Sequence, residues 1–295
     1  MNHLLRLVRP RQWTKNLVVF AGVAFAQRAS NAADVLKAFG AFGVFCLLSG
    51  VVYIINDISD READRLHPVK RFRPIAAGEV TVTSAYLWAV LLAIGAMAAA
   101  ILLSPAFAVV AASYLALMLA YSRCLKHLVI LDVFAISAGF VLRAVAGAAV
   151  IGVEISSWLI VCTILLSLFL AMNKRRHELV ILETGAANHR PILAEYSPTL
   201  LDQMISVVTS STVVAYALYT LSPDTVAKFN THALSLTIPF VLYGIFRYLY
   251  LVHKRDMGGS PERLLLEDKP LLVAVAAWAA CVAVVIYYVG PRGLL

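Results

Sequence analysis

Charged side chains are scarce in this chain of 295 residues. Asp, Glu, Lys and Arg make up 14% of it, while apolar residues reach 61%. Soluble globular domains carry about 25% charged residues, so the composition argues against an ordinary soluble protein. Together with a mean hydropathy of +0.82, the scarcity of charge indicates that lipid surrounds most of the chain.

Cysteine pairs and familiar soluble-enzyme motifs are also missing. The four cysteines stand singly, with no C-x-x-C pair and no histidine at zinc-ligand spacing. No Walker, Ser-His-Asp or zinc-protease motif occurs. The charged N-terminal segment has no small-residue cleavage site, so we do not expect a removable signal peptide.

Positive charge exceeds negative charge by eight, an imbalance that can indicate nucleic-acid binding. The basic residues lie between long apolar segments and not on one soluble face. We therefore expect membrane lipids, and no nucleic acid, as the surroundings of this chain.

Nine stretches are apolar and long enough to cross a bilayer, which requires about 20 residues of helix. They are expected near residues 13–29, 35–56, 82–103, 105–122, 129–151, 156–173, 203–221, 232–252 and 270–290. This pattern predicts an all-α, polytopic membrane bundle of nine transmembrane helices that forms a single domain over residues 1–295.

The positions of lysine and arginine predict the orientation, because short loops rich in them stay cytoplasmic. With the N-terminus inside, most of the 25 basic residues fall on the cytoplasmic side. The longest connections, near residues 57–81, 174–202 and 253–269, fall on that side too. We therefore expect a plasma-membrane protein whose chemistry takes place at the cytoplasmic mouth of the bundle.

The strongest sign of chemistry is the motif N-D-I-S-D-R-E-A-D at residues 56–64. On a helix Asp57, Asp60 and Asp64 share one face, with Asn56 next to Asp60. Three carboxylates so close repel one another unless a cation lies among them, and carboxylate oxygens suit Mg²⁺ bound together with substrate phosphates. We predict that the three aspartates bind Mg²⁺ and act in catalysis; the alternative is a solvated, charged helix end.

Three cations follow this motif. Lys70, Arg71 and Arg73 lie between Pro68 and Pro74, which restrict the backbone around them. Closely spaced cations on a restricted backbone can grip phosphate oxygens, arginine in a bidentate manner. The alternative is that these cations only hold the loop on the cytoplasmic side of the membrane, as positive residues next to a span ordinarily do.

A second charged cluster ends the sixth predicted span. Lys174, Arg175 and Glu178 share one helical face, and we predict that they contact substrate. The alternative is a charge run that stops membrane transfer, an interpretation that we prefer for Arg176 and His177.

Further candidate substrate contacts lie in or near other spans. Arg143 lies within an apolar span, where a charge costs several kcal/mol and indicates a function. Tyr121, Arg123 and Lys126 lie at the mouth between the fourth and fifth spans, where an interfacial belt is the alternative. Lys15, near the N-terminus, is another candidate phosphate contact.

The motif N-D-I-S-D-R-E-A-D resembles the metal-binding motif of the UbiA superfamily of intramembrane prenyltransferases. The similarity extends over the whole chain. Five segments resemble, more narrowly, its branch of decaprenyl-phosphate phosphoribosyltransferases: RPRQWTKN, NDISDREADRLHPVKRFRPIAAG, LKHLVILDVFAISAGFVLRAVAGA, NKRRHEL followed by ETGAA, and SPERLLLEDKPLL. Most of the superfamily carries a second aspartate motif where this chain has NKRRHEL.

The resemblance implies Mg²⁺-dependent transfer of 5-phosphoribose from phosphoribosyl diphosphate to a polyprenyl phosphate, in the arabinose-donor pathway of cell-wall synthesis. This donor carries a diphosphate at C1 and a phosphate at C5, so Lys174 and Arg175 would suit the second phosphate better than aspartates. Two alternatives stay open: a polyprenyl-diphosphate-dependent aromatic prenyltransferase and a membrane carrier of a phosphorylated metabolite. The sequence also leaves open the polyprenyl chain length and the formation of a homo-oligomer.

Overall fold

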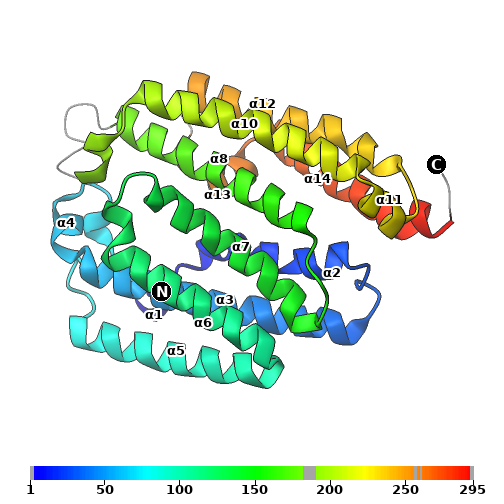
Figure 1. Ribbon diagram of the computed structural model, residues 1–295. Coiled ribbons are helices and arrows are strands. Elements are labelled where there is room, and N and C mark those ends of the chain that lie inside the picture. Colours follow the sequence, from blue (N-terminus) through cyan, green and yellow to red (C-terminus); the bar gives the residue numbers. More distant parts are fainter. Residues whose placement is uncertain (1–2, 182–190, 256–257, 260, 293–295) are drawn as a thin grey trace. The chain divides into compact units, whose positions relative to one another are not determined.

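The structure is a computed structural model that describes residues 3–181, 191–255, 258–259 and 261–292. All regular elements within these residues are helices (Figure 1), as the composition predicts. The motif at 183–187 lies outside the described residues.

Eight helices in the described part of the chain are long and apolar enough to cross a membrane. They are α3 Ala32–Ser59, α5 Val82–Leu103, α6 Pro105–Arg123, α7 Leu131–Ile151, α8 Ser157–Ile181, α10 Pro198–Leu221, α12 Ile238–Arg255 preceded by η5 Ala233–Thr237, and α14 Lys269–Val284 continued by η6 Val285–Val289 and η7 Gly290–Arg292. The prediction of a multi-pass, all-α membrane protein is confirmed.

Shorter helical elements connect or precede the spans. They are α1 His3–Val8, η1 Pro10–Phe20, α2 Ala21–Phe25, α4 Arg61–Leu66, η2 Lys70–Phe72, η3 Leu125–His127, η4 Pro191–Glu195, α11 Pro223–Phe229 and α13 Pro261–Glu267.

The start of several spans follows from their capping residues. Ser104 and Ser197 accept hydrogen bonds from backbone N–H groups in the first turns of α6 and α10, and a proline follows each serine directly. Serine is a preferred N-cap, and proline suits the first helical position because it has no N–H to leave unpaired. Local chemistry therefore sets these boundaries.

The first predicted span, near residues 13–29, is built differently from the other eight. It consists of 11 residues of 3₁₀-helix in η1 followed by 5 residues of α-helix in α2. The rise per residue of these two helix types gives a total length of about 30 Å, close to the hydrocarbon thickness of a bilayer. Nine spans therefore stay a prediction, with the first one as a stretched, composite helix.

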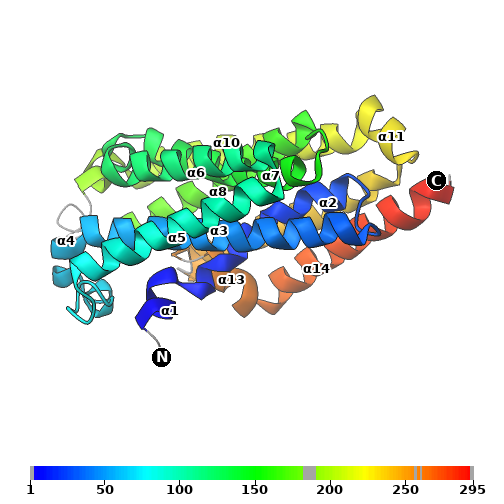
Figure 2. The same ribbon diagram turned by 90° about the horizontal axis from the view of Figure 1, so that it is seen from below.

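The chain divides into two compact units, and the first holds residues 1–155 and 187–192. Helix α3 is its centre, since η1, α5, α6 and α7 all pack against it; Figure 2 shows α3 and α5 side by side. The aromatic core of this unit includes Phe45, whose ring centroid lies 6.0 Å from that of Phe107 and 5.0 Å from that of Tyr114.

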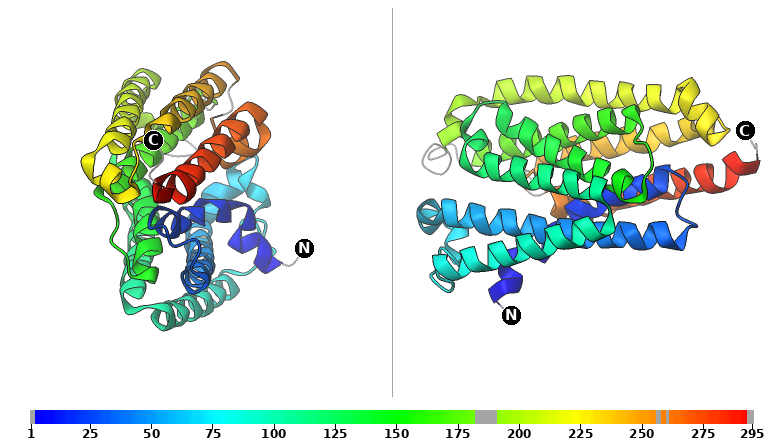
Figure 3. Two further views of the ribbon diagram at one scale, coloured as in Figure 1. Left: turned by 90° about the vertical axis from the view of Figure 1, so that its right-hand side faces the viewer. Right: turned by 60° about the horizontal axis from the view of Figure 1, so that its bottom comes forward.

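The second unit holds residues 156–186 and 193–295. Helices α8 and α10 pack along each other in this unit, and α12 packs against α14 (Figure 3). The expectation of a single domain stays a prediction.

Candidate active site

The three aspartates of the N-D-x-x-D-x-x-x-D motif lie where α3 passes into α4 in the first unit. The backbone N–H of Asp60 donates to the carbonyl of Asn56 at 2.9 Å, and that of Asp64 donates to the carbonyl of Asp60 at 2.8 Å. The helical path is nearly continuous through the motif, so the carboxylates keep the common face that the spacing predicts. Asp57 and Asp64 are only 2% and 3% exposed.

Two arginines neutralise the buried carboxylates. Oδ1 of Asp57 accepts hydrogen bonds from Nη2 of Arg9 at 2.5 Å and from Nη1 of Arg73 at 3.0 Å. The same Nη1 of Arg73 donates to Oδ2 of Asp64 at 2.6 Å. Burial raises the pKa of the Asp64 carboxyl, and the charge of Arg73 opposes that shift. Arg73 therefore bridges two of the three aspartates.

The third carboxylate has its own partners. Nζ of Lys126, on η3, donates to Oδ1 of Asp60 at 2.6 Å, and Nδ2 of Asn56 donates to Oδ2 at 2.8 Å. Lys126 is buried, although it is 66 residues away from Asp60 in sequence. The structure thus brings together six of the residues that the sequence suggests. They are Asn56, Asp57, Asp60, Asp64, Arg73 and Lys126.

The chemistry of the donor set fits Mg²⁺. Among the described residues no three Asp, Glu, His or Cys side chains converge enough to enclose a metal ion by themselves. Mg²⁺ is commonly held by one or two carboxylates together with waters and substrate phosphates. Buried carboxylates beside cations that can turn to phosphate oxygens provide the protein part of such a site.

Arg9 is the member of this site that sequence reasoning missed. It precedes Pro10 and adopts a left-handed backbone conformation, with φ 50°, and its guanidinium lies 5.0 Å from the ring centroid of Tyr53. A non-glycine residue in this region is uncommon and needs support from its surroundings. The only signal in the sequence is an arginine before the proline, which is too common to single out.

Four further candidates belong to the first unit. Lys70 and Arg71 lie on η2; burial raises the pKa of Asp64 and the charge of Lys70, like that of Arg73, opposes the rise, while Arg71 lies 4.8 Å from the ring centroid of Phe72. Lys15 lies on η1, and Tyr121 in α6 packs against the core of the unit. Their substrate contacts stay predictions.

Arg143 lies in a buried polar network of the first unit. Its Nε donates to Oδ1 of Asn16 at 2.8 Å, its Nη2 to the hydroxyl of Tyr114 at 2.7 Å and its Nη1 to the carbonyl of Gly139 at 3.0 Å. The hydroxyl of Ser49 lies 3.3 Å from both Oδ1 of Asn16 and the hydroxyl of Tyr114. The sequence predicts that the guanidinium of Arg143 contacts substrate. In the structure three of its N–H donors are directed at protein oxygens.

The second charged cluster belongs to the second unit and lies on α8. Arg175 is 2% exposed, and its Nη1 donates to Oε2 of Glu178 at 2.7 Å, while Nζ of Lys174 lies 4.0 Å from Oε1. The three side chains share one face, as their spacing predicts. Arg176 pairs instead with Asp202, at 2.5 Å from Nε to Oδ1.

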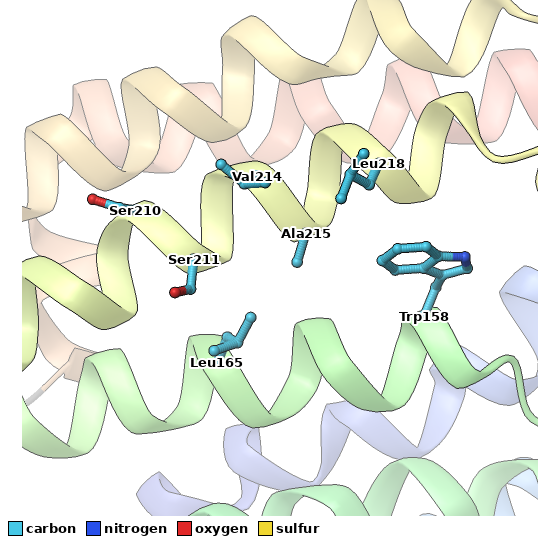
Figure 4. A pocket seen from close by; sticks show the side chains of 7 residues that line it. All are labelled: Trp158, Leu165, Ser210, Ser211, Val214, Ala215 and Leu218. Carbon is cyan, nitrogen blue, oxygen red and sulfur yellow. The ribbon is translucent and has the colours of Figure 1, made fainter.

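The second unit also has two apolar hollows. One, of about 400 Å³, lies between α8 and α10, and Figure 4 shows its lining of Trp158, Leu165, Ser210, Ser211, Val214, Ala215 and Leu218. The other, of about 580 Å³, lies between α12 and α14 and includes Lys269 in its lining. Such linings suit hydrocarbon and not a phosphate group.

Comparison with known proteins identifies the family. The model of the UbiA prenyltransferase family matches residues 16–266. The decaprenyl-phosphate phosphoribosyltransferases of Corynebacterium glutamicum and Mycolicibacterium smegmatis are both 37% identical to this chain, over 96% and 97% of it and 86% and 92% of their own lengths. The structure of a UbiA homologue from Archaeoglobus fulgidus bound to GPP and Mg²⁺ has a TM-score of 0.73 at 21% identity, covering 97% of this chain and 99% of that one. The resemblance seen in the motifs is confirmed: the chain belongs to the UbiA prenyltransferase family.

Proposed function

We propose that this protein is a transferase that moves 5-phosphoribose from phosphoribosyl diphosphate to a polyprenyl phosphate and releases diphosphate. The names of the two relatives, similar over nearly the whole chain, support this reaction. The aspartate cluster, with Asp57 and Asp64 buried, is the observation that carries it, because its carboxylates and cations suit a Mg²⁺-diphosphate group. We place the cluster at the cytoplasmic mouth of a plasma-membrane protein, as the positive residues indicate.

The charges of the aspartate cluster suggest how the donor binds. Asp57, Asp60 and Asp64 are balanced by Arg9, Arg73 and Lys126. When bound to the aspartates with the diphosphate, Mg²⁺ would neutralise the charge that builds up as the diphosphate departs. The carboxylates would then hold the metal, while the three cations exchange their carboxylate partners for diphosphate oxygens.

The transfer itself needs little proton chemistry. The bond from C1 of the ribose to the diphosphate oxygen breaks, and an oxygen of the acceptor phosphate forms the new bond to C1. A phosphate monoester is largely dianionic near neutral pH because its second pKa is about 6. A strong general base is therefore not required, consistent with a site built from carboxylates and cations.

The cations outside the aspartate cluster are proposed to bind the phosphate groups of the substrates, because their charge is opposite. We assign the 5-phosphate to Lys174 and Arg175, two adjacent cations that both lie within 4.0 Å of Glu178. Lys70, Arg71, Lys15 and Tyr121 are further substrate contacts in this proposal. The isoprenoid chain of the acceptor would lie against the apolar surfaces between spans, of which the hollow in Figure 4 is an example.

Incubation of the purified protein with ribose-labelled phosphoribosyl diphosphate, Mg²⁺ and decaprenyl phosphate tests this function. We expect label in the lipid extract, and none when Mg²⁺ is chelated. Prenylation of an aromatic acceptor from a polyprenyl diphosphate would support the first alternative. Uptake of the sugar phosphate into vesicles without turnover would support a carrier.

A further inference from the structure

The segment that carries Arg9 has an unusual backbone. Residues Pro10–Phe20 form a 3₁₀-helix of 11 residues, whereas runs longer than three or four residues are uncommon because the hydrogen-bond geometry is poor. Contacts outside the segment must therefore hold it in this form. The sequence does not indicate them, since they come from residues at least 30 positions away, one of them 127 positions away.

Asn16, near the middle of η1, provides one of these contacts. It is completely buried; its Oδ1 accepts from Nε of Arg143 and from Ser49, and its Nδ2 lies 3.4 Å from Sγ of Cys46. Arg143 is on α7, whereas Ser49 and Cys46 are on α3. One amide side chain thus ties η1 to two spans of the first unit.

Close packing against two glycines holds the segment on both sides of Asn16. A Cβ atom on Gly147 would lie 1.9 Å from the carbonyl oxygen of Val19, so the end of η1 rests directly on α7. A Cβ atom on Gly50 would lie 2.9 Å from Cγ1 of Val8, so the chain before η1 rests on α3. Gly147 is one helical turn after Arg143 and lies on the same face of α7.

The form of this segment decides where Arg9 lies. A 3₁₀-helix rises about 2.0 Å per residue and an α-helix about 1.5 Å. Relaxation to α-helix over the seven residue steps from Arg9 to Asn16 would shorten the segment by roughly 3.5 Å. With the Arg9 side chain in its present conformation, such a shift would break its bond of 2.5 Å to Asp57.

We propose that Asn16 and Arg143 are positioning residues that keep η1 extended and thereby hold Arg9 at the aspartate cluster. This inference rests on the proposed function, in which Arg9 contacts the diphosphate. Arg143 then acts at a distance from the substrate, in place of the direct contact that its depth in the membrane suggests. The hydroxyl of Tyr114 accepts a hydrogen bond from Arg143. We call Asn16, Arg143 and Tyr114 together the clamp.

The test is a double-mutant cycle on kcat/KM for phosphoribosyl diphosphate. Asn16→Leu keeps the size of the side chain and removes its polar atoms, whereas Asn16→Asp keeps an oxygen for Arg143. We expect Asn16→Leu to lower kcat/KM about ten-fold, mainly through KM, and Asn16→Asp to restore most of it. Because Asn16 acts through Arg9, Arg9→Ala with Asn16→Leu should be no worse than Arg9→Ala alone.

A matched pair of tyrosine variants keeps the test valid if Asn16→Leu does not fold. Tyr114→Phe removes the hydroxyl that Arg143 uses; Tyr216→Phe is the same change in the second unit, at a buried tyrosine bonded to Thr237 and Trp278. Only Tyr114→Phe should raise KM for the donor. Three outcomes would overturn the proposal. The losses in kcat/KM of Arg9→Ala and Asn16→Leu could multiply in the double variant, or KM could stay unchanged in Asn16→Leu. The two tyrosine variants could also have equal effects on KM.

Hydrogen exchange separates this inference from the proposed function. Asn16→Leu should speed exchange of the amides in residues 10–20 and leave α10 unchanged, whether or not the protein transfers phosphoribose. Absence of transfer by the wild-type protein, with faster exchange in the variant, would refute the function and not the clamp. Unchanged exchange in residues 10–20 would refute the clamp.

Discussion

The two charged clusters of the molecule differ in the groups that they bring together. In the first unit three aspartates form ion pairs with Arg9, Arg73 and Lys126. In the second unit two adjacent cations, Lys174 and Arg175, lie within 4.0 Å of Glu178. Carboxylates together with cations suit an ion pair such as Mg²⁺-diphosphate, whereas two adjacent cations suit a lone phosphate. The donor proposed above carries one group of each kind.

The largest effect is expected at the aspartates. Asp57→Asn removes a metal-ligand charge and leaves Arg9 and Arg73 partly uncompensated, so turnover should fall roughly a hundred-fold to a thousand-fold. Initial rates across a Mg²⁺ titration measure it. Asp224→Asn, the same change at an exposed residue of α11, is the control. A rate near that of the wild type at limiting Mg²⁺ would show that Asp57 does not hold the metal.

A smaller loss is expected at Lys126, and it should not depend on the 5-phosphate. Lys126→Met removes the charge beside Asp60, so kcat/KM should fall about ten-fold to a hundred-fold, equally for phosphoribosyl diphosphate and for ribosyl 1-diphosphate. Lys37→Met, at an exposed position of α3, should leave both donors unaffected. A loss confined to one donor would remove Lys126 from the diphosphate end.

The second cluster should show the opposite selectivity. Lys174→Ala should lower kcat/KM for phosphoribosyl diphosphate about ten-fold or more, because a charge-assisted hydrogen bond is lost, and have little effect with ribosyl 1-diphosphate. Steady-state kinetics of both enzymes with both donors isolate the interaction, with Lys254→Ala as a control at the end of α12. An equal loss with both donors would mean that Lys174 acts elsewhere.

The smallest effect concerns a charge pair of the second unit that has no role in the proposed reaction. Hydrogen bonds from Arg247, at 2.8 and 3.1 Å, lower the pKa of the Asp268 carboxyl. A depressed pKa stabilises the fold above the unfolded pKa, about 3.9, and this gain is lost as pH falls through the folded value.

The variant Asp268→Asn isolates this charge because asparagine can still cap α14. Its Tm should be slightly below that of the wild type at neutral pH, and the difference should shrink as the pH falls below about 3.9. A difference that does not shrink in acid would point to packing and not charge.

Sequence patterns predict the spans and part of the site for physical reasons that are local. Length and apolarity mark the helices, and the spacing of Asp57, Asp60 and Asp64 is sufficient to place them on one face. The partners of these residues are set by tertiary packing. Arg9 reaches Asp57 across 48 residues, and Arg143 reaches Asn16 across 127, so neither pair has a local signature.

The first span shows the same limit. Its hydrophobicity predicts a helix, but the end of its 3₁₀ segment packs directly on Gly147 in α7, a contact that no local pattern of residues 10–20 contains. Propensity and periodicity indicate that a segment is helical. They do not indicate whether it is α-helix or 3₁₀-helix when a distant backbone packs directly against it.

The fate of the two ends of the donor tests the central claim most directly. Phosphoribosyl diphosphate labelled with one isotope in the 5-phosphate and another in the diphosphate is incubated with the protein, Mg²⁺ and decaprenyl phosphate, and the lipid is extracted. The proposed reaction predicts that the 5-phosphate label enters the lipid phase while an equal amount of diphosphate label is released into water. Labels that stay together, in either phase, would contradict it.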